Sequence, residues 1–436
     1  MKILLIDPPF QRFMDFKKYY TPLGLLYIAA ELQKRDHTVW VYDADYNPEG
    51  KSFDFLEKME HYPLYIEGLE DDKHAIWGEV EEVFDQIKPD IVGISLISTK
   101  LASGMEVARR FKKMGAKRIV CGGPHVSIKP EEVLSNPYVD SVIVGEGEDI
   151  FEDALKERKI VAERIIDLDR VSFPARERLY NLFNYAPKDL GMIISSRGCP
   201  FNCSFCCSEL LWGRTVVYRS LDNIMDEITF INKEYGTTDF YIIDDDFTCN
   251  KKRTLEFCRR MKKMNLTWSC LTRADLIDET IALAMKKSGC RMIKIGLESG
   301  SEKMLRIMNK RIKKDDVIRA ADILRRFDLP WVAYFMVATP GENEEDIEET
   351  ISFIREVKPT FISFSIFTPY PGTPLYERLS LQKIPYHLYN HHSIFNKFSQ
   401  IPLERIKEVA KFSDEYNKDS KNLLFEVSEI KTYSKK

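Results

Sequence analysis

Short apolar runs alternate with amphipathic stretches along almost the whole chain, and this alternation limits the possible folds more than any other feature. Within residues 1–150, helical patterns separate five strand candidates, at 2–7, 38–43, 91–97, 118–123 and 141–148. The stretch 46–74 is polar and irregular, and the clearest helical patterns cover 22–34, 76–87 and 101–114. Strands that alternate with helices pair in parallel, because each connection crosses back over the sheet. Residues 1–150 are therefore predicted to form an α/β domain with a doubly wound parallel sheet.

A second alternation of strands and helices begins at residue 191. Helical patterns lie between six strand candidates, at 192–196, 240–244, 268–273, 292–297, 332–338 and 361–367. Six such units predict a partial (β/α)6 barrel over residues 191–376, more open than the eight-stranded barrel. Residues 151–190 are predicted to be a connector, in which 173–183 packs against a neighbouring element. The remaining residues, 377–436, are predicted to form a helical and irregular extension.

Charge and composition narrow the functional classes. The chain has 436 residues with 64 basic and 68 acidic side chains, so its net charge of −4 offers no basic surplus for nucleic acid. No apolar run reaches the roughly 18–20 residues that cross a bilayer, and the apolar run at the N-terminus is too short for a signal peptide. We therefore expect a cytoplasmic protein, in which nine cysteines favour metal binding over disulfides.

Three closely spaced cysteines follow the first strand of the second alternation, where a barrel presents its active site. They are Cys199, Cys203 and Cys206, with C-x3-C-x2-C spacing. Three thiolates leave one iron of a [4Fe–4S] cluster open for a ligand. Structural zinc is the main alternative, but it needs four ligands and no second cysteine pair exists in the sequence. The adjacent Cys207 is expected to be a packed thiol.

This cysteine segment resembles the radical S-adenosylmethionine (SAM) superfamily, whose motif is C-x3-C-x-aromatic-C. The match is complete, with Phe205 in the aromatic position. The resemblance implies that Cys199, Cys203 and Cys206 hold the cluster and that SAM chelates its open iron. It further implies that one electron, from a flavodoxin- or ferredoxin-type donor, cleaves SAM to a 5′-deoxyadenosyl radical. The cluster and SAM supply this chemistry, and the protein positions and shields them.

Later strand ends extend the resemblance over roughly residues 190–375. Asp244 and Asp245 follow the second strand and resemble residues that meet the amino group of SAM, and Arg273 resembles a partner of its carboxylate. Glu298 and Ser299 resemble positions near the ribose or sulfonium.

Each of these positions also has a structural interpretation. The Asp244–Asp246 run could form a solvated turn or a helix cap, Arg273 a structural salt bridge, and Ser299 or Ser301 a helix cap. Tyr370 is expected either to line the cavity above the barrel or to pack.

The N-terminal strand ends GISLIST, CGGPHVS and VGEGE resemble the cobalamin-binding domain that precedes many radical SAM barrels. The predicted sheet is then of the flavodoxin-like, cobalamin-binding type. The resemblance implies that small residues line a groove for the nucleotide tail of cobalamin: Ser95, Ser98, Gly122, Gly123 and Gly145. The alternative is that these glycines only make tight turns.

One feature of cobalamin mutases is missing from this region. The loop after the first strand reads DPPFQRF and lacks the histidine that binds cobalt in those enzymes. Cobalamin is therefore expected to bind base-off without a protein histidine, and His125 is expected to be a surface or loop residue.

The resemblance implies a cobalamin-dependent radical SAM enzyme that methylates an unactivated carbon of a small-molecule, lipid or natural-product substrate. Ring closure, rearrangement or C–C coupling on the same scaffold, with or without cobalamin, is the first alternative. A methylthiotransferase shares the barrel, but its N-terminal domain carries three more cysteines, whereas residues 1–190 contain only Cys121. A non-enzymatic iron–sulfur or cobalamin carrier would need neither Arg273 nor Glu298.

Overall fold

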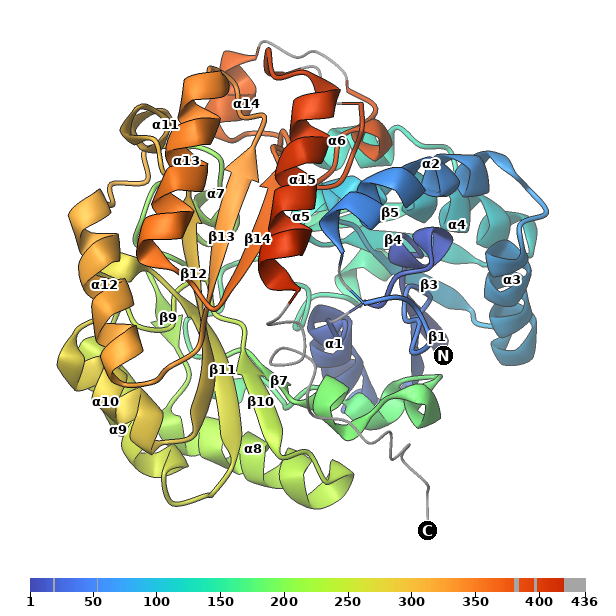
Figure 1. The fold of residues 1–436 in the computed structure, drawn as a ribbon. Coiled ribbons are helices and arrows are strands. Elements are labelled where there is room, and N and C mark those ends of the chain that lie inside the picture. The colour runs from blue at the N-terminus through green and yellow to red at the C-terminus, as the bar shows by residue number, and fades with distance from the viewer. Residues whose placement is uncertain (19, 53, 380–383, 396–397, 419–436) are drawn as a thin grey trace.

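The computed structural model describes residues 1–436 except 19, 53, 380–383, 396–397 and 419–436. Two parallel sheets lie side by side, the N-terminal one in blue and cyan and the second in yellow and orange (Figure 1). Within the described part of the chain, no helix is both long enough and apolar enough to span a membrane.

The first sheet has the strand order β2-β1-β3-β4-β5-β6. Its strands are β1 (Lys2–Asp7), β2 (Thr38–Asp43), β3 (Ile91–Ser95), β4 (Arg118–Gly122), β5 (Ser141–Val144) and β6 (Lys159–Val161). All neighbours pair in parallel, and the order 2-1-3-4-5 is flavodoxin-like. In β1, Ile3 and Leu5 pack into one core and Leu4 and Ile6 into another, which explains its continuous apolar run. The predicted doubly wound sheet is confirmed.

Helices cover both faces of this first sheet. They are α1 (Leu23–Gln33), α2 (Phe55–Glu70), α3 (Ala75–Ile87), α4 (Leu101–Lys113), α5 (Pro124–Ile128) and α6 (Pro130–Leu134). Helix α2 lies inside the stretch 46–74, which the sequence pattern treats as irregular. Asp54 caps it by accepting a hydrogen bond from Glu57 N, and Pro63 sits within it. Strand β6 also carries the first sheet beyond residue 150, into the predicted connector.

The second sheet has the strand order β14-β13-β12-β11-β10-β7. Its strands are β7 (Met192–Ile193), β10 (Asp239–Ile242), β11 (Thr267–Thr272), β12 (Cys290–Glu298), β13 (Trp331–Val337) and β14 (Phe361–Ile366). Its outer helices are α8 (Leu221–Tyr235), α9 (Lys251–Met261), α10 (Glu279–Lys287), α11 (Glu302–Ile307), α12 (Lys314–Arg326) and α13 (Glu344–Val357). The end strands β7 and β14 do not pair within the described residues, so the barrel is open and six-stranded, as predicted.

Three short elements shape the loops above the barrel. A small antiparallel pair, β8 (Ser196–Arg197) and β9 (Val217–Tyr218), flanks the cysteine segment. The helices α7 (Ser208–Trp212) and α14 (Pro374–Arg378) follow the cysteine segment and the last strand, respectively.

Two segments fasten the domains together. In the connector, buried Arg176 donates to Glu227 Oε1 at 2.9 Å and to Met192 O at 2.7 Å, so the amphipathic part of the connector packs as expected. The C-terminal helix α15 (Leu403–Asn417) packs against β14 and α2 (Figure 1). Asp414 in that helix accepts hydrogen bonds from the first amides of α2, Phe55 N at 3.1 Å and Leu56 N at 3.0 Å.

Candidate functional site

A cavity of about 310 Å3 lies between the two domains, where the carboxyl ends of their strands face each other. Ser95, Gly122 and Gly145 contribute the ends of β3, β4 and β5 to its wall. Ile243 and Asp245 contribute the end of β10 from the barrel side. Ligands of open parallel sheets bind beyond the carboxyl ends of the strands, so this cavity is the natural binding site.

Glycines keep the N-terminal side of the cavity open. A Cβ atom on Gly122 would have no neighbour closer than 3.9 Å, so any larger side chain there would grow into the cavity. Gly123 and Gly145 have φ of +99° and +90°, a backbone conformation that favours glycine. Two of these glycines therefore make turns, and the third leaves space in the cavity.

Ser98 and His125 lie away from this cavity wall. The Ser98 hydroxyl and His125 Nδ1 are 2.9 Å apart in a buried hydrogen bond, and neither residue lines the cavity. The expected surface position of His125 is wrong, because its side chain is buried under Tyr386, with 5.0 Å between the ring centroids. Burial lowers the pKa of His125 to about 4, so the imidazole is neutral at physiological pH.

A buried ion triad crosses the cavity from one domain to the other. Arg197, just before the cysteine segment, donates to Glu146 and, at 2.6 Å, to Glu148, both of which follow β5. Its guanidinium also lies over the rings of Tyr27 and Trp212, at 5.5 Å and 5.7 Å from their centroids. All five residues line the cavity. The repeated glutamates of GEGE were the only sequence signal for this triad.

The cysteine segment is held from two sides. Ser204 N donates to Met308 O at 2.8 Å, and Asn309 Nδ2 donates to Asn202 O at 2.8 Å, both beside the end of α11. Leu375 N of α14 donates to Ser204 O at 2.9 Å. The barrel therefore fixes the middle of this loop while its flanks reach the cavity.

The three thiols have the accessibility that a cluster requires. Cys199 and Cys203 are partly buried and Cys206 is exposed, yet burial raises the pKa of Cys199 to about 11 and of Cys206 to about 12. These two observations describe thiols in a recess, which are protonated until iron displaces the protons. Ser208 N donates to Cys206 Sγ at 3.4 Å. No three His, Cys, Asp or Glu side chains in the described part of the chain are arranged around a single metal position.

The three aspartates after β10 have separate roles. Asp244 is buried and accepts four hydrogen bonds from the amides and hydroxyls of Ser195 and Ser196, at 2.5–3.1 Å. Its oxygens are therefore used by the protein itself. Asp245 lines the cavity and accepts from Ser208 Oγ at 2.6 Å. Asp246 is buried, and its Oδ2 accepts no hydrogen bond from the described residues.

The predicted residues after β11 and β12 are also engaged. Arg273 forms a two-pronged pair with Asp275, at 3.0 Å for both bonds, and lies over the Phe201 ring at 3.8 Å. The Ser299 hydroxyl meets Thr350 Oγ1 at 3.1 Å and accepts from Ser301 N. The Arg273 pair matches its structural interpretation as a salt bridge, whereas Ser299 is not the cap of α11: that cap is Ser301, whose hydroxyl accepts from Met304 N at 3.5 Å.

Glu298 pairs with a buried lysine above the barrel. Its Oε1 accepts from Lys310 Nζ at 2.7 Å, and that ammonium lies 5.9 Å from the Phe205 ring centroid. The Tyr370 hydroxyl and His391 Nε2 are 2.8 Å apart in a hydrogen bond. Burial is the main cause that raises the pKa of Tyr370, and the nearby Cys207 and Cys206 raise it further. This tyrosine therefore lies near the cysteine segment.

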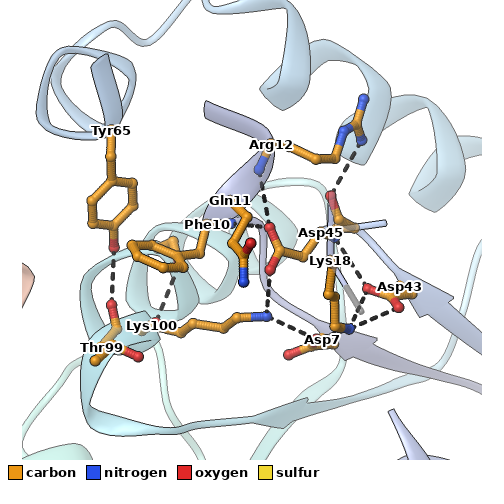
Figure 2. A network of polar contacts seen from close by, with 12 residues as sticks. Asp7, Phe10, Gln11, Arg12, Lys18, Asp43, Asp45, Tyr65, Thr99 and Lys100 are labelled. Carbon is orange, nitrogen blue, oxygen red and sulfur yellow. Dashed lines mark hydrogen bonds and ion pairs between the residues drawn. The ribbon is translucent and has the colours of Figure 1, made fainter. Parts of the chain in front are cut away.

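A second buried ion network fixes the loop after β1, where cobalamin mutases carry their histidine (Figure 2). Lys18 Nζ bonds Asp7 at 2.5 Å and Asp43 at 2.7 Å, and Lys100 Nζ bonds Asp7 at 2.8 Å. Asp45 Oδ1 accepts from Phe10 N at 2.6 Å and lies in the same network. The loop is thereby held against the end of β2.

Comparisons with known proteins agree with this architecture. Residues 14–155 match the model of the B12 binding domain, and residues 193–354 match that of the radical SAM superfamily. An uncharacterized methyltransferase of Pyrococcus horikoshii is 30% identical over 86% of this chain and 83% of its own length. The anaerobic magnesium-protoporphyrin IX monomethyl ester cyclase of Cereibacter sphaeroides is 25% identical over 89% of this chain and 66% of its own length.

A solved structure shares the two-domain fold. The radical SAM methyltransferase TsrM from Kitasatospora setae, with cobalamin and a [4Fe–4S] cluster bound, superposes with a TM-score of 0.65. The match covers 88% of this chain and 79% of that chain at 17% identity. The two family matches, one on each sheet, and the relative at 30% identity decide the family. The chain belongs to the radical SAM superfamily of enzymes and carries a B12-binding domain ahead of its radical SAM domain.

Proposed function

We propose that the protein is a cobalamin-dependent methyltransferase that cleaves SAM to a 5′-deoxyadenosyl radical, removes a hydrogen atom from an unactivated carbon and replaces it with a methyl group. The observation that carries this proposal is the shared cavity, since the glycine-lined strand ends of one domain face, across it, Arg197 and Trp212, which flank the cysteine segment of the other. When bound, a [4Fe–4S] cluster supplies the electron that cleaves SAM, and cobalamin supplies the methyl group.

On the barrel side, the residues present fit a cluster and SAM. Cys199, Cys203 and Cys206 would hold the cluster, with Phe205 beside them. The unpaired Oδ2 of Asp246 is a buried acceptor close enough to Cys199 to raise its pKa, and it fits a cationic group such as the amino group of SAM. Asp245 would add a second carboxylate at the cavity wall. The reductant is proposed to be a flavodoxin- or ferredoxin-type protein.

On the N-terminal side, the residues fit the nucleotide tail of cobalamin. Ser95, Gly122, Gly123 and Gly145 would line its groove. None of the described residues that line the cavity is a histidine, and the loop after β1 is tied down by Asp45. These observations support base-off cobalamin without a protein histidine.

Reconstitution tests the proposed reaction. The anaerobic protein, loaded with iron, sulfide and cobalamin, is supplied with SAM and a reductant. We expect both 5′-deoxyadenosine, from reductive cleavage, and S-adenosylhomocysteine, from methyl loss. Omission of cobalamin should remove only the second product. Absence of 5′-deoxyadenosine would contradict radical chemistry, and 5′-deoxyadenosine without any cobalamin-dependent S-adenosylhomocysteine would favour the ring-closing alternative, which the cyclase relative supports.

Gly122→Phe is expected to weaken cobalamin binding while the iron content stays unchanged. The phenyl ring would project into the cavity, where overpacking costs about 1–3 kcal/mol, equivalent to roughly tenfold or more in affinity. Retained cobalamin and iron are measured after reconstitution and desalting. Gly78→Phe is the matched control, because Gly78 lies on exposed α3 with open space around it. Equal cobalamin retention in both variants would remove Gly122 from the proposed groove.

A further inference from the structure

The inner face of the barrel carries a lysine in the middle of its central strand. In β12, Ile293, Ile295 and Leu297 pack into the large core shared with the outer helices. Side chains alternate between the faces of a strand, so Lys294 points to the opposite side, into the barrel. Lys294 is half-buried there, on the same face as Met292, which closes the bottom of the barrel with Val332 and Phe361.

Tyrosines surround the lysine inside the barrel. Lys294 Nζ lies 3.5 Å from the ring centroid of Tyr241 on β10. Tyr334, on the neighbouring β13, is partly buried against the cluster at the barrel bottom. Burial is the main cause that raises the pKa of Tyr241 and of Tyr334, and Tyr20 from the N-terminal domain is the next. The hydroxyl of Tyr20 therefore lies near both side chains. Tyr20 is 52% exposed, yet burial raises its pKa.

The acidic groups near Lys294 are committed to other cations. Asp239, on β10 two strands away, is held by Arg291 through two bonds of 2.7 Å and 2.5 Å. Glu298, on the same strand, is paired with Lys310 at 2.7 Å. Among the described residues, Lys294 forms no hydrogen bond and no ion pair. Burial lowers its pKa to about 8, so at neutral pH a large fraction remains a cation without a counter-charge.

A partly buried cation that lies on an aromatic ring but lacks an anionic partner is unfavourable unless a ligand supplies the missing charge. The aromatic rings around it offer flat apolar faces to the rest of such a ligand. We propose that Lys294 binds an acidic group of the substrate, and that the substrate is an anionic small molecule whose flat or apolar body lies against Tyr241 and Tyr334. This inference rests on the proposed function, because it takes the barrel interior as the place where the substrate is held.

Matched pairs of small molecules test this inference on the reconstituted holoenzyme. Calorimetry compares benzoate with benzamide and 1-naphthoate with 1-naphthamide, each pair differing in charge but not in shape. We expect wild type to bind at least one carboxylate about tenfold more tightly than its amide, as for a charge-assisted hydrogen bond. Lys294→Met should abolish this preference and Lys294→Arg should retain it. Lys286→Met, on the exposed face of α10, is the matched control.

Two outcomes overturn the inference: no carboxylate preference in wild type, or the same preference in Lys294→Met. Cleavage of SAM by the wild-type protein without substrate separates this inference from the proposed function, because that activity needs no bound carboxylate. If the wild-type protein cleaves no SAM, the proposed reaction is contradicted. If it cleaves SAM but shows no preference for carboxylates, only the role of Lys294 is contradicted. Thermal unfolding of each variant shows whether the barrel stays folded, and Lys294→Arg keeps the test valid if the methionine variant does not fold.

Discussion

Cys203→Ala is expected to abolish both the iron–sulfur cluster and all reductive cleavage of SAM. Cys199, Cys203 and Cys206 are the three partly or fully accessible thiols that the motif spacing brings to one loop, and a four-iron cluster with one open iron needs all three. Loss of one ligand leaves two, so the expected effect is complete loss rather than a reduction. Visible absorbance, iron content and 5′-deoxyadenosine formation after anaerobic reconstitution measure it.

The neighbouring Cys207 provides the matched control for this experiment. Cys207 is a partly buried residue whose carbonyl accepts hydrogen bonds from Leu210 N and Leu211 N of α7, and Cys207→Ala preserves these backbone contacts. We expect the Cys207 variant to retain the cluster. A Cys203 variant that still holds a full four-iron cluster would remove Cys203 from the ligand set, and loss of the cluster in the Cys207 variant would put that thiol in its place.

The strands were predictable because most of them are buried on both faces. A continuous apolar run such as KILLID lacks the polar face of an amphipathic helix, and it forms β1 between two hydrophobic cores. Helix α2 was missed for the opposite reason. Its buried residues include Lys58 beside Tyr62 and Tyr65, and Pro63 interrupts its pattern, so its apolar periodicity is weak.

The candidate site was predictable only as far as motif positions go. Gly122, Gly123 and Gly145 stand at the predicted strand ends and line the cavity, because a glycine at a strand end acts through its own backbone. Asp244 and Ser299 also stand at the predicted strand ends, but their oxygens are already bonded to residues about 50 positions away. A sequence pattern gives the type of residue at a strand end and not the partner that reaches it.

Two charged residues escaped prediction for the same reason. Arg197 stands two residues before Cys199 and Lys294 lies within β12, and neither carries a sequence signal of its own. Arg197 pairs with two glutamates, whereas Lys294 has no acidic partner among the described residues. This difference depends on the fold and not on the local sequence.

Arg197→Met is expected to destabilise the protein by about 3–5 kcal/mol, because it leaves two buried carboxylates without their cation. The side chains of Arg197, Glu146 and Glu148 are only 5–7% exposed. The measurement is the free energy of unfolding from denaturant titration. Arg326→Met is the matched control, since the Arg326–Glu279 pair is 58% and 62% exposed and should contribute less than about 1 kcal/mol.

A compensating variant tests whether the charges are the cause. In Glu146→Gln/Glu148→Gln/Arg197→Met the buried carboxylates are gone, so much of the lost stability should return. If the single Arg197 variant is as stable as the Arg326 control, the triad does not hold the domains together. Because Arg197 stands two residues before Cys199 and its two partners follow β5, the same bond that stabilises the fold sets the cysteine segment against the glycine-lined strand ends. We therefore expect the unfolding transition and the cobalamin affinity of Arg197→Met to fall together, and the triple variant to restore the first more fully than the second.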